Sequence, residues 1–293
     1  MKKLVAMLAC WLVWLSPAMS QGVSVEVVLD QAYFLPHEAL MVKVRITNFS
    51  GQPLQFGKDD DWLSFAVEGN KSFVVPRLAP VPVRGEFTLD SSKVAIRTVD
   101  LAPCFDLSRP NHYTVRATVN LPQWQRLVTS DKKGFDILSG AKLWEQDFGV
   151  PQGVVQVGEQ PEVRKYALFQ TIHGKQLKLY LRLSDVSENK VFRIFPIGPM
   201  VSFSKPEPQL DKFGNLHILY QTGARSFNYS IVSPDGLLIT RETHDYYNNS
   251  RPILRAGSDG RISVAGGNRR ASADDLPPPT TTVSSNDAEP QKR

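Results

Sequence analysis

Apolar side chains fall on every second position in several stretches of this sequence, and this alternation constrains the fold more than any other feature. A period of two places apolar residues on one face of a strand and polar residues on the other. Because a half-polar sheet must bury its apolar face against another sheet, the pattern predicts an antiparallel β-sandwich. The alternating stretches are residues 23–29, 42–47, 63–68 and 113–119, with turn-forming residues between them.

Length and composition extend this prediction to a second β domain. The chain has 293 residues, 42% of them hydrophobic and 22% charged, with 21 prolines and 19 glycines. These values exclude wholesale disorder, and the length exceeds the ~100 to 200 residues of a usual single domain. We therefore predict an all-β protein with four parts after a leader. They are an antiparallel sandwich at residues 21–139, a packed connector at 140–161, a second antiparallel β domain at 162–270 and a disordered tail at 271–293.

The N-terminus has the pattern of a cleavable export signal. Lys2 and Lys3 precede an apolar run at residues 4–15, and small residues follow up to Ser20. The apolar run is shorter than the ~20 residues that cross a bilayer. We predict a signal peptide at residues 1–20, a periplasmic or extracellular location and no transmembrane span.

The cysteine content and the net charge limit the kinds of molecule that this protein could bind. Once Cys10 leaves with the signal, Cys104 is the only cysteine, so its thiol is either buried or paired between chains. The net charge is +5, and neither half carries the dense basic stripe that nucleic-acid binding requires. We predict an unidentified envelope protein as partner and no nucleic acid, and we leave the oligomeric state open.

The second half contains internal repetition. Residues 208–220 are similar to residues 252–267, each with a proline, a short strand, a Gly-centred turn and an alternating strand. The turn glycines Gly174, Gly214 and Gly260 are 40 and 46 residues apart, which is close to the ~40 to 50 residues of propeller blades. The alternatives are an open β domain, a ring completed by two chains, or a small antiparallel sheet with ordinary hairpins.

Three resemblances to known families add to this prediction. Residues 39–51 and 106–115 resemble bacterial immunoglobulin-like sandwich modules, including proteinase-inhibitor domains, with Asn111 in place of a glycine. The Gly-centred turns resemble those of sialidase-type propeller repeats. The export signal, the sandwich, the connector residues 143–150 and the segments 196–200 and 220–223 together resemble an uncharacterised family of exported bacterial proteins. The resemblances imply an immunoglobulin-like sandwich followed by a β domain with propeller-blade-like repeats, and they carry no activity with them.

No sequence motif for a catalytic or metal centre stands out. The five histidines lack zinc-site spacing, and both a nucleophile elbow and a Gly-rich phosphate loop are missing. Asp59, Asp60 and Asp61 form the densest acidic cluster, which we interpret as either a calcium-binding loop or a solvated loop before a strand. We predict no catalytic residue, no metal and no cofactor, and a protein that is not an enzyme.

A polar and aromatic cluster in the second half is a candidate ligand surface. Aromatic faces beside hydrogen-bonding groups suit sugar or peptide ligands. The alternative is a set of strand-edge residues around a hairpin. The cluster consists of His217, Tyr220, Arg225, His244, Asp245, Tyr246 and Tyr247.

These observations favour an exported, non-catalytic binding or structural protein of the bacterial envelope that acts through protein–protein contacts. One alternative is an inhibitor of an extracytoplasmic protease, in which loop 48–53 or loop 59–61 would enter the enzyme cleft. Another is a carbohydrate-binding or carbohydrate-active protein, and the active form needs carboxylates that face one another across a site.

Overall fold

The computed structural model describes residues 22–151 and 162–276, which form an all-β structure. This confirms the predicted fold class. Within these residues the helical elements are the short 3₁₀ turns η1 (Asn70–Ser72), η2 (Ala102–Cys104) and η3 (Pro122–Trp124), and no helix is long and apolar enough to cross a membrane. The predicted signal peptide at residues 1–20 lies outside the described residues.

The described residues divide into two compact units. Unit 1 contains residues 22–30, 41–104 and 113–134. Unit 2 contains residues 31–40, 105–112, 135–151 and 162–276.

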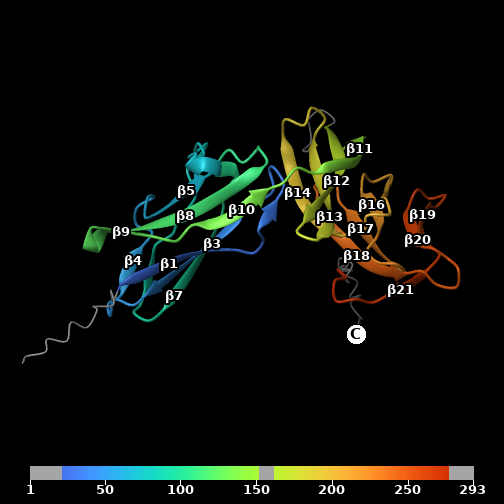
Figure 1. Cartoon of the computed structure of the whole chain (residues 1–293). Coiled ribbons are helices and arrows are strands. Elements are labelled where there is room, and N and C mark those ends of the chain that lie inside the picture. The colour runs from blue at the N-terminus through green and yellow to red at the C-terminus, as the bar shows by residue number, and fades with distance from the viewer. Residues whose placement is uncertain (1–21, 152–161, 277–293) are drawn as a thin grey trace, which may run out of the picture. The chain divides into compact units, whose positions relative to one another are not determined.

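The strands between Val23 and Ile137 form two larger sheets and one two-stranded sheet in a sandwich-like arrangement (Figure 1), and most of their residues lie in unit 1. The strands are β1 (Val23–Leu29), β2 (Tyr33–Phe34), β3 (Met41–Asn48), β4 (Leu54–Phe56), β5 (Leu63–Glu68), β6 (Phe87–Leu89), β7 (Val94–Asp100), β8 (Asn111–Leu121), β9 (Arg126–Thr129) and β10 (Lys133–Ile137). One sheet has the order β1-β3-β7, and the other has the order β2-β10-β8-β5 with β9 also paired to β8. The two-stranded sheet consists of the antiparallel strands β4 and β6.

The apolar residues of the predicted alternation form the buried faces of the sheets in unit 1. In β3, Val42, Val44 and Ile46 are buried, Met41 and Arg45 are exposed, and Lys43 is half-buried. In β8 every second residue from Tyr113 to Leu121 is buried. Antiparallel pairing of β3 with both β1 and β7 keeps these faces in register.

A cluster of aromatic side chains packs in one part of the unit 1 core. Trp62 is 3% exposed, and its ring lies 5.7 Å from the Phe56 ring and 5.6 Å from the Phe87 ring between centroids. The Trp62 Nε1 group donates a hydrogen bond to the Val83 carbonyl at 2.6 Å. Because the indole N–H has a partner, the whole side chain can be buried without an unsatisfied polar group.

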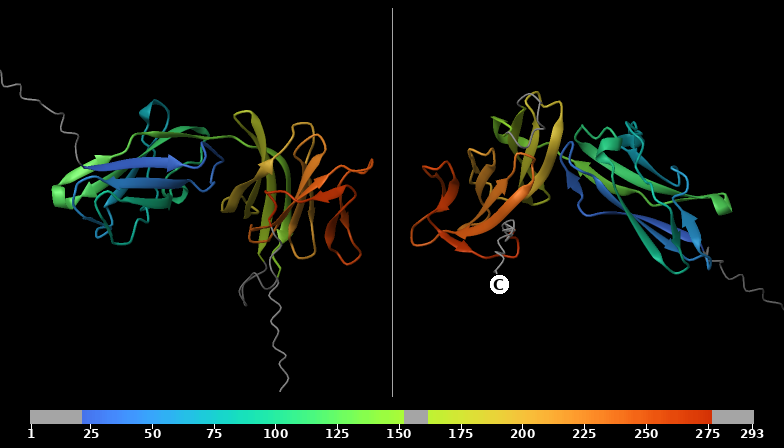
Figure 2. Two further views of the ribbon diagram at one scale, coloured as in Figure 1. Left: turned by 90° about the horizontal axis from the view of Figure 1, so that it is seen from below. Right: turned by 180° about the vertical axis from the view of Figure 1, so that it is seen from behind.

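Unit 2 contains two further antiparallel sheets and a hairpin. The strands are β11 (Ala141–Gly149), β12 (Val163–His173), β13 (Gln176–Asp185), β14 (Val191–Pro199), β15 (Glu207–Leu210), β16 (Leu216–Gln221), β17 (Ser226–Val232), β18 (Leu238–Asp245), β19 (Ile253–Ala256), β20 (Ile262–Ala265) and β21 (Asn268–Arg270). The sheet orders are β11-β12-β13-β14 and β15-β16-β17-β18-β21, and β19 pairs with β20. Figure 2 shows the green-to-yellow sheet beside the orange-to-red sheet from two sides.

The two sheets of unit 2 share one apolar core. Side chains of β12 and β13, such as Leu168 and Leu181, pack in the same cluster as Leu216, Ile218 and Tyr220 of β16. The predicted turn glycines do lie in hairpin turns at positive φ, with Gly174 at 62°, Gly214 at 77° and Gly260 at 76°. Glycine adopts this conformation without the steric cost of a Cβ atom. Whether the strands are propeller-like repeats stays a prediction.

Two predicted segments have structure that the sequence analysis did not specify. In the predicted connector, residues 141–149 form β11, which pairs with β12, and residues 152–161 lie outside the described residues. In the predicted tail, Asp275 Oδ2 accepts hydrogen bonds from Arg269 and from the Ser272 amide, and Leu276 bridges to Arg241. Residues 277–293 also lie outside the described residues.

Cys104 is buried in unit 1 with 2% of its surface exposed. Burial raises the pKa of its thiol, and Asp100 adds to this shift. Of the two alternatives for this cysteine, the structure supports burial.

Candidate functional site

The structure buries three of the seven residues of the predicted ligand surface. His217 and Tyr220 lie on β16 and are 5% and 1% exposed, and His244 on β18 is 8% exposed. Tyr220 belongs to the apolar core, and its hydroxyl donates to the Ile197 carbonyl at 3.4 Å. These side chains therefore contact other parts of unit 2 and do not face solvent.

His217 and His244 belong to a buried polar network that the sequence did not indicate. His217 Nδ1 is 2.6 Å from Tyr229 Oη, and His217 Nε2 is 3.2 Å from Asp211 Oδ2. The Tyr229 ring contacts the His244 ring edge to face, and His244 Nε2 lies 3.3 Å from Glu242 Oε2. Burial lowers the pKa of both histidines, although the carboxylates oppose that shift. Neutral imidazoles in this network satisfy buried polar groups and hold β16, β17 and β18 together.

Asp211 connects this network to a hairpin turn. Its Oδ1 atom accepts hydrogen bonds from the Phe213 and Asn215 amides, each at 2.8 Å, and its Oδ2 atom accepts from the Asn215 side chain at 2.9 Å. Burial acts to raise the pKa of Asp211, but hydrogen bonds from Asn215 and His217 outweigh it and lower the pKa. The carboxylate therefore stays ionised and fixes the turn between β15 and β16.

We expect Asp211→Ala to lower the free energy of unfolding by about 3 kcal/mol, since buried groups that bond to the carboxylate lose their partner. Urea titration followed by circular dichroism would measure this. The matched control is Asp259→Ala, because Asp259 caps the β19–β20 turn but is 58% exposed. The control should change stability by less than about 1 kcal/mol. Equal effects of the two substitutions would contradict a role for the buried network.

The other four predicted residues lie at the surface near the end of β18. The Arg225 guanidinium lies 5.1 Å from the Tyr246 ring centroid. Asp245 accepts hydrogen bonds from Ser226 and Arg270, and the bond from Arg270 is the main cause that lowers the pKa of Asp245. Tyr247 is 56% exposed. A ligand role for this surface stays a prediction.

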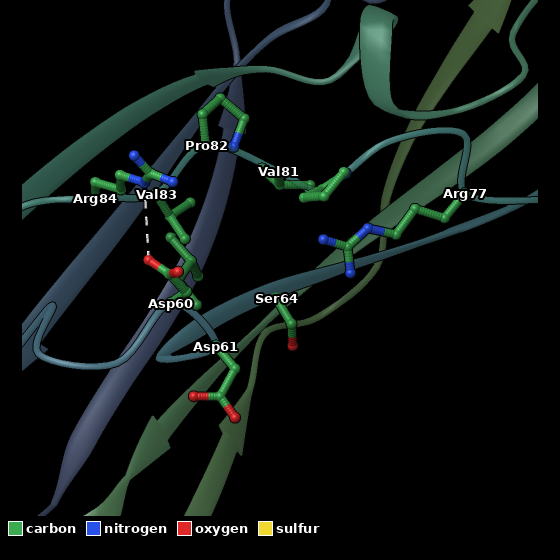
Figure 3. Close-up of a pocket in the computed structure, with 10 residues that line it drawn as sticks. Asp60, Asp61, Ser64, Arg77, Val81, Pro82, Val83 and Arg84 are labelled. Carbon is green, nitrogen blue, oxygen red and sulfur yellow. Dashed lines mark ion pairs between the residues drawn. The ribbon is translucent and has the colours of Figure 1, made fainter.

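A pocket of 510 Å³ lies in unit 1, where the sequence analysis expected only a loop (Figure 3). One wall comes from the start of β5 and the loop before it, and the other comes from an extended, proline-rich segment at residues 77–84. Residues of the two walls are Asp60, Asp61, Leu63 and Ser64 on one side and Arg77 with Pro80, Val81, Pro82, Val83 and Arg84 on the other. Within the described residues, no group of three or more His, Cys, Asp or Glu side chains could hold a metal ion.

The pocket has apolar walls and charged ends. Val81 and Val83 are buried, which places their side chains in the core below the pocket. Asp60 Oδ1 lies 3.9 Å from Arg84 Nε, and both side chains are 87% exposed, so this ion pair is weak. Figure 3 shows the Arg77 guanidinium extending toward Ser64. Arg77 and Asp61 therefore offer one positive and one negative group to a bound molecule.

Only part of this pocket is predictable from the sequence. Asp60 and Asp61 stand out as an acidic cluster, whereas Arg77 and the Pro80-Val81-Pro82 run were not predicted to be part of a site. An extended run with two prolines cannot form a central strand, because proline has no amide hydrogen. That signal indicates a non-strand segment, but the sequence does not show which strand the segment lies beside.

Comparison with known proteins does not assign a family. No family model matches the chain, and no curated protein matches it. Among solved structures, the chain is similar to Spo0M, the sporulation control protein from Bacillus subtilis, at 8% sequence identity and a TM-score of 0.29. That match covers 58% of this chain and 82% of the other. Because this similarity is too low to support an argument, the predicted family stays a prediction and the pocket geometry is the basis for a functional proposal.

Proposed function

We propose that this protein is a non-catalytic binding protein of the bacterial envelope and that unit 1 binds a partner protein at its pocket. The observation that carries the proposal is the open pocket between the start of β5 and residues 77–84. Its 510 Å³ falls within the ~300 to 1,000 Å³ of ligand-binding sites. The signal-like residues 1–20 support a periplasmic or extracellular location.

The chemistry of the lining favours binding over catalysis. Among the described residues that line the pocket, Ser64 is the only one with a hydroxyl group, and its Oγ atom donates to the Thr118 carbonyl at 3.5 Å. Within the part of the chain that the structure describes, no histidine lines the pocket to act as its base. The carboxylates of Asp60 and Asp61 also line the pocket, and Asp60 forms a weak, exposed ion pair with Arg84. These groups can orient a bound chain but do not form an activated nucleophile.

Exposed apolar side chains near the pocket favour a protein over a small molecule as the partner. Phe73, Val74 and Leu78 are 64%, 67% and 64% exposed. They lie in or beside the segment that forms one wall. Neighbouring exposed apolar groups are typical of protein-interaction sites.

A charge reversal in the pocket tests the proposal. We expect the wild-type protein to retain a specific partner from an envelope extract of the bacterium that makes it. Arg77→Glu should reduce that retention about tenfold or more, as expected for loss of a charged contact at an interface. Arg126→Glu is the matched control, because Arg126 is an exposed arginine of unit 1 that does not line the pocket. A partner retained equally by both variants would show that the pocket is not the binding site.

A second candidate function is inhibition of an extracytoplasmic protease, and loop 48–53 favours it. Asn48 is fully buried, and its side-chain amide donates to the Gln52 and Leu89 carbonyls at 2.7 and 2.9 Å. Its Oδ1 atom accepts from the Ser50 amide and hydroxyl. Gly51, Gln52 and Pro53 are exposed at the tip. A loop fixed in this way loses little conformational entropy when it enters a cleft.

Inhibition assays against serine, cysteine and metalloproteases of the envelope test this second function. An inhibitor should slow peptide hydrolysis at equimolar concentration, and Asn48→Ala should weaken inhibition about tenfold by releasing the loop. Gln125→Ala, at another exposed turn of unit 1, is the control that should leave inhibition unchanged. Full hydrolysis rates with every protease would rule the function out.

A further inference from the structure

β5 is the edge strand of its sheet, and only part of its outer edge is covered. On the inner side β5 pairs with β8 along its whole length. On the outer side the Val75 amide donates to the Val67 carbonyl at 2.9 Å, and Glu68 bridges to Val74. Residues 74 and 75 therefore begin an additional antiparallel strand on this edge.

The chain leaves the edge directly after Val75. In an antiparallel ladder, the pairing of Val75 with Val67 would place Arg77 opposite Phe65 and residue 79 opposite Leu63. The Leu78 amide instead donates to the Cys104 carbonyl at 2.8 Å. Residues 77–84 thus run away from β5.

A second contact ties the far end of the segment to Trp62, the residue directly before β5. The Val83 carbonyl accepts the hydrogen bond from Trp62 Nε1 at 2.6 Å, and Trp62 is anchored in the aromatic cluster of the core. The pocket of 510 Å³ lies between the segment and the first residues of β5, where the next strand of the ladder would run (Figure 3).

The backbone of β5 faces this space with unpaired groups. The Trp62 carbonyl accepts from the Asn120 amide at 2.8 Å, so the backbone of Trp62 faces β8. Because backbone groups alternate along a strand, those of Leu63 and Phe65 face the outer edge, as those of Val67 do. Within residues 22–151 and 162–276, the outward N–H and C=O groups of Leu63 and Phe65 have no backbone partner.

We propose that an extended segment of the partner protein adds to β5 as a new edge strand, with its main chain hydrogen-bonded to Leu63 and Phe65. This inference rests on the proposed binding function and specifies how the partner is recognised. Main-chain bonds of this kind supply affinity for any extended chain, and side-chain contacts supply specificity.

Charges at the pocket define the chemistry of the added strand. The Arg77 guanidinium extends toward Ser64 of β5, and its Nε group donates to the nearby Ala79 carbonyl (Figure 3). Asp61 precedes Leu63 in the chain and lines the pocket, and the weak, exposed ion pair of Asp60 and Arg84 lies beside it. The segment therefore carries an acidic side chain near Arg77 and a basic side chain near Asp61.

Selection of peptides and an N-methyl scan test the mode of binding. A library of random linear heptapeptides is selected on the immobilised full-length protein, and the best peptide is resynthesised with one amide methylated at a time. In strand addition, every second amide donates to β5 and the others point away. We expect methylation of alternate amides to weaken binding about tenfold or more, with little effect at the positions between them.

A charge swap tests the side-chain assignment. Arg77→Glu should weaken the selected peptide about tenfold, and replacing the acidic residue of the peptide by lysine should restore binding to Arg77→Glu only. Phe65→Pro removes one outward amide and leaves the ladder with β8 in place, so it should also weaken binding. Arg126→Glu should bind like the wild type.

Several results would overturn the inference. They are an N-methyl scan without a period of two, no peptide that depends on Arg77, or a selected peptide that binds as a helix by circular dichroism. Sedimentation that shows a dimer which Phe65→Pro dissociates would assign the edge to a second copy of this chain. If an Arg77-dependent partner is retained but the scan shows no alternation, the binding function stands and only strand addition fails.

Discussion

Trp62→Ala should lower the free energy of unfolding of unit 1 by about 3 to 5 kcal/mol, the usual cost of removing a buried tryptophan. The side chain is 3% exposed and packs against Phe56 and Phe87, so the substitution leaves a cavity in the aromatic cluster. It also removes the hydrogen bond to the Val83 carbonyl. Hydrogen exchange measured by mass spectrometry would report the loss in peptides from β5 and residues 77–84.

Two further variants separate the contributions to this effect. Trp62→Phe keeps an aromatic ring and loses the hydrogen bond, and we expect it to cost about 1 to 3 kcal/mol. Trp124→Ala makes the same chemical change at a partly exposed tryptophan of η3, and its effect should be clearly smaller. If Trp62→Ala and Trp124→Ala destabilise unit 1 equally, the aromatic cluster is not the main support of the pocket wall.

Unit 2 should lose about 3 kcal/mol of stability through His173 as the pH falls from 7 to 4. His173 ends β12, is 9% exposed, and its Nε2 atom lies 3.1 Å from Tyr180 Oη. Burial lowers the pKa of His173 from 6.5 to about 4, and the charge of Lys178 adds to the shift. Folding therefore favours the neutral imidazole.

The sign of the pH effect follows from the two pKa values. Above pH 6.5 the imidazole of His173 is neutral in both states, so the stabilisation is complete. Between pH 6.5 and 4 the unfolded chain binds a proton that the folded chain does not, and stability falls. Burial lowers the pKa of His217 and His244 as well, which adds to the fall. Burial raises the pKa of Glu38, which acts in the opposite direction.

His173→Gln isolates the contribution of this one group. The variant should show a smaller pH dependence of the unfolding free energy, by about one proton between pH 6.5 and 4. Urea titrations at several pH values would measure the slope, and histidine nitrogen shifts in NMR spectra would report the protonation state directly. A His173 that titrates near 6.5 in the folded protein would contradict the prediction.

The sequence predicted the strands of unit 1 well because one of their faces is solvated. Residues 23–29 and 63–68 match β1 and β5, and residues 42–47 and 113–119 lie within β3 and β8. In these strands buried and exposed positions alternate, so hydrophobicity along the chain reports the fold directly. The same reasoning correctly predicted an all-β protein without long helices.

For the predicted ligand surface, the alternation of apolar and polar residues did not show which side chains are exposed. β16 is covered on both faces, since Leu216, Ile218 and Tyr220 belong to one apolar cluster and Leu219 belongs to another. A histidine in such a strand is buried whichever face it points to. Polar residues such as His217 interrupt the apolar run, so the sequence does not show that both faces of the strand are buried. For this reason we interpreted these residues as a surface.

Sequence alone determined the strand content and the turns, because each of these depends on residues that are close along the chain. Tertiary structure decided which polar groups are exposed and where the pocket lies. The pocket forms because residues 77–84 do not continue the pairing with β5. Their backbone groups instead form hydrogen bonds with the Cys104 carbonyl and the Trp62 side chain. Such long-range contacts leave no periodic signal in the sequence, because they are set by packing between segments that are far apart along the chain.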